Sequence, residues 1–364
     1  FAATTTEVDN AIDFRLVSDI ELVQDISLTT HPDGADVNAG DDGDVLFDRT
    51  GAITLDSAAG NLLTITVTDA TAGGGNDGDV ELPALIGTNN RIGDFVISVD
   101  TGEIVLGNDG SNASTVNADA ITFDGEVVLT ANTTMTTDGS AFDFSATEVS
   151  GDVAGWNLAI DTTSATVGAD GGAVSLGLFD NDADTGSATG DSFVNQLSVT
   201  TTGNGVGAAG TITLHDDLLL DDDGAGTAGS LSVIGGGNIV LATSVIIDTE
   251  DGDTNTVSGG SVDFGTSEVS GNAAGRDLEI DVQTAGTGSN GGTVTLFTFG
   301  TSGGSAINDL LIELGSVNAT PGTLTINGST ITLADDGAGD VSSLVVNGGG
   351  TGAQGRTILE TDVS

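Results

Sequence analysis

The stretch Phe144-Ser-Ala-Thr-Glu-Val-Ser-Gly151 decides the fold of this chain, because it returns as Phe264-Gly-Thr-Ser-Glu-Val-Ser-Gly271, 120 residues later. The match continues without a gap through two further pairs of segments, 158–161 with 278–281 and 171–176 with 291–296. Apolar residues recur at the same places while their polar neighbours vary. A fixed spacing of this kind predicts a fold built from internal repeats.

A second block repeats at a slightly different spacing. Residues 222–237 match residues 335–350 at an offset of 113, so seven residues are absorbed in the polar stretch that follows Phe179 and Phe299. That stretch is expected to be a surface loop. A weaker copy precedes both blocks. The matches divide the chain into a cap or connecting segment, 1–43, and three repeat units, 44–141, 142–261 and 262–364.

Short alternating runs carry almost all the large apolar residues, as in Leu63-Thr-Ile-Thr-Val67 and Leu324-Thr-Ile326. A period of two residues is typical of β-strands. Glycine, Asp and Asn cluster between the runs, for example at 73–78, where they favour tight turns. With no convincing amphipathic helix pattern, the sequence predicts an all-β protein.

Two architectures fit a repeat of this size. In a parallel β-solenoid, or β-helix, coils of roughly 20 residues stack at about 4.8 Å. In a string of tandem β-sandwich domains, each unit of roughly 100 residues folds separately. Very short strands, small or β-branched core residues and glycine-rich turns favour the solenoid, and the coil period cannot be read. In either case the repeated apolar positions should be buried: Phe144, Leu158, Ile160, Val174 and Leu176, with Phe264, Leu278, Ile280, Val294 and Leu296.

Charge and composition exclude several functions. The 364 residues include 55 acidic and only 5 basic residues, all arginines, for a net charge of −50. Binding to phosphates requires clustered Lys and Arg, so no nucleic-acid partner is expected. Without cysteine there is no disulfide, thiol nucleophile or thiolate metal site. No apolar run approaches the ~18 residues of a membrane span, so none is predicted.

Several segments carry a family resemblance, among them 128–135, 322–333 and 346–354. They resemble the degenerate β-rich repeats of filamentous-haemagglutinin-like giant surface proteins of bacteria, and the likeness covers roughly residues 44–364. The resemblance implies a secreted, elongated β-helical fibre or adhesin. The family's amino-terminal secretion domain is not found here, so export route and activity are not carried over.

No catalytic or cofactor-binding residues are predicted, and the chain is not expected to be an enzyme. His31 and His215 lie far apart, and neither has a nucleophile at a recognisable spacing. Pairs of carboxylates occur throughout so acidic a chain and do not identify a glycosidase. Trp156 is a weak candidate for stacking on a sugar, since Arg276 occupies the equivalent place of the next repeat.

One acidic loop is a candidate calcium site. Asp180, Asp182 and Asp184 alternate along the loop, and Asp191 follows, so their carboxylates could supply several of the six to eight oxygens that calcium takes. Residues 41–44, 76–79, 250–253 and 335–337 form thinner loops of the same kind. Solvated turns that use Asp and Asn for their backbone preferences are the alternative interpretation.

These observations predict an extracellular structural protein, a rod or filament on a bacterial surface, with an adhesive role implied by the resemblance. The alternatives are a carbohydrate-binding or carbohydrate-degrading β-helix and a calcium-dependent surface-layer domain string. Because a terminal coil exposes unpaired backbone groups while the acidic sides repel one another, self-association is expected head to tail, with other copies or with more of the same polypeptide. Carbohydrate or a host cell surface is a further candidate partner.

Overall fold

The computed structural model shows an all-β chain, as predicted. It describes residues 6–8, 11–17, 19–30, 43–47, 54–68, 78–107, 113–153, 155–180, 192–222, 226–250, 258–284, 289–316, 320–328, 330–334, 342–348 and 356–359. No helix occurs in these ranges, and so none that could cross a membrane.

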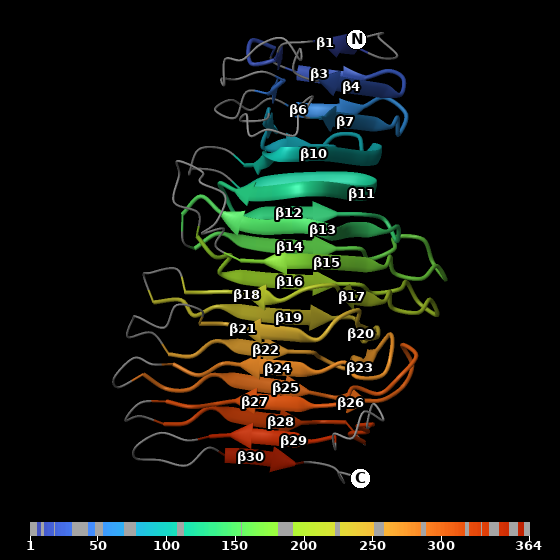
Figure 1. Ribbon diagram of the computed structural model, residues 1–364. Coiled ribbons are helices and arrows are strands. Elements are labelled where there is room, and N and C mark those ends of the chain that lie inside the picture. Colours follow the sequence, from blue (N-terminus) through green and yellow to red (C-terminus); the bar gives the residue numbers. More distant parts are fainter. Residues whose placement is uncertain are drawn as a thin grey trace.

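The strands wind into a stack of coils with three walls (Figure 1). Wall 1 contains β3 (Asp19–Leu22), β6 (Thr54–Ser57), β9 (Leu85–Ile86), the start of β11 (Ser114–Leu129), β12 (Thr133–Thr136), β14 (Asn157–Asp161), β16 (Gln196–Thr200), β19 (Ser230–Ile234), β22 (Ser261–Asp263), β25 (Thr293–Leu296), β28 (Thr323–Ile326) and β30 (Arg356–Leu359).

The other two walls complete each coil. Wall 2 contains β1 (Thr6–Val8), β4 (Ile26–Thr30), β7 (Leu63–Val67), the start of β10 (Ile92–Leu106), the middle of β11, the starts of β13 (Phe142–Gly151) and β15 (Val174–Phe179), β17 (Ile212–Leu214), β20 (Ile239–Leu241), β23 (Glu268–Gly271) and β26 (Thr298–Phe299). Wall 3 contains β2 (Ile12–Asp13), β5 (Val45–Leu46), β8 (Val80–Glu81), the ends of β10, β11, β13 and β15, β18 (Leu218–Leu219), β21 (Val245–Asp248), β24 (Leu278–Asp281), β27 (Leu310–Glu313) and β29 (Leu344–Asn347).

Every pairing between these strands is parallel, and each strand pairs with the strand of the same wall in the next coil. A β-sandwich would place antiparallel neighbours side by side. The fold is therefore the parallel β-solenoid, and the sandwich alternative is excluded.

Coil length differs from the expected 20 residues. Ser114 pairs with Thr133, which gives a coil of 133 − 114 = 19 residues, whereas Leu158 pairs with Leu197, which gives 197 − 158 = 39. In the short coil, β11 passes through all three walls without a loop. Longer coils carry turns between walls, and these turns project outward without disturbing the stack. Only the shortest coil thus has the expected length.

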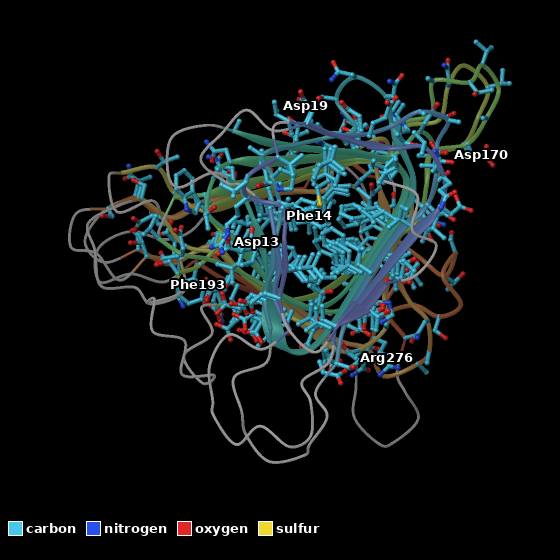
Figure 2. All side chains as sticks on the ribbon, turned by 90° about the horizontal axis from the view of Figure 1, so that it is seen from above. Asp13, Phe14, Asp19, Asp170, Phe193 and Arg276 are labelled. Carbon is cyan, nitrogen blue, oxygen red and sulfur yellow. The ribbon has the colours of Figure 1, made fainter. Side chains whose placement is uncertain are left out.

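The core is one continuous apolar column inside the three walls, and Figure 2 looks down it. Strands such as β14 and β16 alternate buried and half-buried residues, as the period of two predicts. All ten repeated apolar residues from Phe144 to Leu296 named above are at most 1% exposed, which confirms their predicted burial.

Glycines fill corners where successive coils come closest. A Cβ on Gly237 would overlap the carbonyl oxygen of Gly210, and one on Gly210 would overlap that of Gly172. A second column has the same arrangement, with Gly292 against the carbonyl of Gly260. The glycine-rich turns are therefore needed for close stacking as well as for turn formation.

Candidate metal centre

Most of the predicted calcium loop cannot be placed. Asp182, Asp184 and Asp191 lie outside the described residues. Asp180 is described, and its backbone N–H donates to the carbonyl oxygen of Val149 at 3.3 Å, directly after β15. The predicted site therefore stays a prediction.

A different acidic group lies within the described part of the chain. Asp221, Asp222 and Glu250 each offer a carboxylate oxygen, and these oxygens lie within 4.8 Å of one another. Asp222 is 4% exposed and Glu250 is 3% exposed, while Asp221 is half-buried. Three carboxylates so close and so buried distinguish this group from the solvated acidic turns elsewhere.

Coil stacking brings the three residues together. Leu219 at the end of β18 pairs with Asp248 at the end of β21, so Asp221 and Glu250 leave wall 3 at the same corner in adjacent coils. The N–H of Glu250 donates to Asp248 Oδ1 at 2.9 Å. On the other side, Asn195 Nδ2 donates to the carbonyl oxygen of Asp221 at 2.9 Å. The group is thus held by backbone contacts from three coils.

The chemistry of this group is that of a hard cation site. Burial of like charges at this distance is costly unless a proton or a cation compensates them. Carboxylate oxygens are the ligands that calcium prefers in proteins. Sequence reasoning noted the acidic turns at 222–226 and 250–253 separately, but nothing in the local pattern indicated that residues 28 positions apart would meet.

Other carboxylates of the chain cap the backbone of the next coil. Asp56 accepts hydrogen bonds from the N–H of Asn89 at 3.0 Å and from its side chain at 2.7 Å. Burial alone would raise the pKa of Asp56, but the hydrogen bonds from Asn89, Asn90 and Thr54 outweigh it, and the pKa is lowered. Such caps explain how an acidic chain can order so many Asp residues with few basic partners.

Trp156 is not the open platform that a sugar would need. Its ring packs against the core, and its Nε1–H donates to Asp152 Oδ1 at 2.5 Å. The equivalent Arg276 donates from Nε to Asn272 Oδ1 at 3.1 Å, also four residues back. Both side chains therefore serve the same turn, which explains why an aromatic and a charged residue can replace one another there.

Comparisons with known proteins add no relative. No family model matches the chain, and no curated protein and no solved structure matches it either. The resemblance to filamentous-haemagglutinin-like repeats accordingly stays a prediction.

Proposed function

We propose that this chain is a segment of an extracellular structural rod that lengthens along its own axis, as expected of a surface fibre of bacteria. The observation that carries the proposal is the uninterrupted parallel ladder from the first coil to the last (Figure 1). At about 4.8 Å per rung, the twelve strands named in wall 1 span about 53 Å. Such a body supplies length and stiffness with little surface devoted to any one site.

Both ends of the stack support axial contact. Among the described residues, β3 pairs only with β6 and β30 pairs only with β28, so each end strand has one ladder edge without a neighbour. At the first end an apolar cavity of about 200 Å³ is lined mainly by core residues, including Phe14, which stacks on Phe47 at 5.1 Å. Further coils, from the same polypeptide or from a second copy, would pair the edge and cover the cavity.

Electron microscopy and light scattering of the purified chain test this proposal. We expect rods whose lengths are multiples of about 53 Å and whose mass rises with concentration. Ile20→Glu places a charge in the end cavity and should leave single units, whereas Val23→Glu, on an already exposed side chain, should assemble like the wild type. A compact, monodisperse monomer at every concentration would refute axial assembly, and labelling of intact bacterial cells with an antibody would check the surface location.

A second candidate function is cation-dependent stabilisation. The specific observation that favours it is the buried group of Asp221, Asp222 and Glu250. A calcium ion there would neutralise carboxylates from two adjacent coils and so clamp the coils together. In this proposal the ion has a structural role, and the rod stiffens where calcium is abundant.

A further inference from the structure

A shallow groove of about 460 Å³ crosses the outer face of wall 3 over β21, β24, β27 and β29. Its floor is one outward column, in which Ile246, Glu279, Leu311 and Val345 are neighbours in register. Ile246 is 38% exposed and Val345 is 39% exposed. Large aliphatic side chains therefore face solvent in the middle of strands, at positions that a strand of this type usually gives to polar residues.

Three carboxylates along the groove are held in fixed positions. Asp217 Oδ1 accepts the N–H of Ile246 at 2.7 Å, and Asp277 Oδ1 accepts that of Asp309 at 3.1 Å. Asp309 Oδ1 in turn accepts the N–H of Ser343 at 2.7 Å. These backbone donors are neutral, so they orient the carboxylates without cancelling their charge. A preorganised row of anions loses little entropy when a cation binds.

No basic residue among those described forms an ion pair with the groove. Arg276 directly precedes Asp277, yet its Nε–H donates to Asn272 within its own turn. The ion pair found in the described ranges joins Arg15 to Asp13, at the other end of the stack. Burial raises the pKa of Asp217, and the nearby charges of Asp216 and Asp180 raise it further. The groove therefore has negative charge that an external cation would stabilise.

We propose that this groove docks a lysine-rich extended segment of a partner protein. Lysine supplies both parts of the complement, because its ammonium group can reach Asp277 or Glu279 while its four methylenes cover Ile246 and Val345. A second copy of this chain would bring its own charge of −50 and be repelled. A metal ion would use the carboxylates but leave the aliphatic row in water. This proposal does not depend on the rod proposal.

A fluorescent hepta-lysine peptide, followed by fluorescence anisotropy, tests the groove in the full chain. We expect Glu279→Gln and Ile246→Ser each to weaken binding, and the double variant to weaken it at least about fivefold. The matched controls are Asp124→Asn, an exposed acid of wall 2, and Ile234→Ser, 51% exposed in wall 1. Both controls should bind the peptide like the wild type.

The alternatives give different outcomes. Equal losses in groove and control variants would mean that the peptide senses only the overall charge, and would overturn the proposal. An unchanged affinity for Ile246→Ser would remove the aliphatic contact and overturn it as well, as would no binding at low salt. Carbodiimide cross-linking of the bound peptide provides a second readout, since attachment at Glu279 supports the groove and attachment confined to other walls contradicts it.

Discussion

Leu158 and Leu278 occupy equivalent places of the sequence repeat, yet they enter the core from different walls. Leu158 lies on β14 in wall 1, and Leu278 lies on β24 in wall 3. Each is 1% exposed. The repeat thus preserves the inward direction of the side chain but not the wall that presents it.

The same displacement affects the other equivalent strands. Val174 lies in wall 2 and its equivalent Val294 in wall 1, and Val149 lies in wall 3 and its equivalent Val269 in wall 2. From Leu158 the chain completes three coils to Val262 and then passes walls 2 and 3 to reach Leu278. One repeat therefore contains 3 × 3 + 2 = 11 strand positions. Because eleven is not a multiple of three, each copy is turned by one wall.

Local structure is nonetheless repeated faithfully. Gly151 forms an isolated antiparallel bridge with Ser192, and its equivalent Gly271 forms one with Ser305. These pairs enclose 192 − 151 = 41 and 305 − 271 = 34 residues, so the seven-residue difference lies in the stretch where the sequence predicts a loop. A turn of this shape can follow any wall, because every corner of the prism presents the same two neighbouring coils.

Truncation of the equivalent leucines should destabilise the protein equally. Leu158→Ala and Leu278→Ala each leave a cavity in a fully packed core, at an expected cost of about 2–5 kcal/mol in the free energy of unfolding. Ile246→Ala, on the outer face, should cost less than about 1 kcal/mol. Denaturant unfolding followed by circular dichroism measures all three. A harmless Leu278→Ala would contradict the inward position of wall 3.

A methyl group at a glycine corner should be as harmful as a core cavity. Gly292→Ala places a Cβ against the carbonyl oxygen of Gly260 in the preceding coil, so the coils must separate locally. We expect a loss of at least about 2 kcal/mol. Ser232→Ala, on the outward side of β19, should change the melting temperature little. If both variants melt alike, the close approach at the corner has no energetic weight.

Calcium should raise the melting temperature more than sodium chloride at equal ionic strength. Binding to the folded state alone stabilises by about 2.7 kcal/mol at a hundredfold excess over the dissociation constant. Glu250→Gln should remove the calcium-specific part and, without calcium, should itself be stabilising because it removes a buried charge beside Asp221 and Asp222. Asp124→Asn serves as the control of equal charge change. Equal responses to the two salts would leave only screening, and a full calcium response in Glu250→Gln would place the ion elsewhere.

The pH dependence of stability should show the strain at Asp217. Its folded-state pKa is raised from the ordinary 3.8, first by burial, so its stabilising contribution is present below that value and is lost as pH rises through the folded-state pKa. Asp217→Asn keeps an acceptor for the N–H of Ile246 and removes the charge. At pH 7 the variant should therefore be more stable, by less than about 1 kcal/mol. Thermal melts should show this gain shrinking toward about pH 3, and a destabilised variant at pH 7 would contradict the prediction.

Local pattern by itself determined the strands, their inward faces and their turns. Alternation in segments such as Leu63–Val67 decides which side chains can be buried, whatever lies next to the strand. The placing of the loop after Phe179 likewise needs only the comparison of two copies of the sequence. These properties depend on residues close together in the chain, and so the sequence suffices to predict them.

Tertiary structure alone decided which strand stacks on which. Coils of 19 to 39 residues, the turn of each repeat by one wall, the meeting of Asp221 with Glu250, and the groove over Ile246 and Val345 all follow from that stacking. The physical reason is that a parallel rung is closed by hydrogen bonds to a strand many residues away, and loops of different length reach the same rung at little difference in free energy. Periodicity therefore encodes the direction of each side chain, while the partner of each strand depends on contacts across the whole coil.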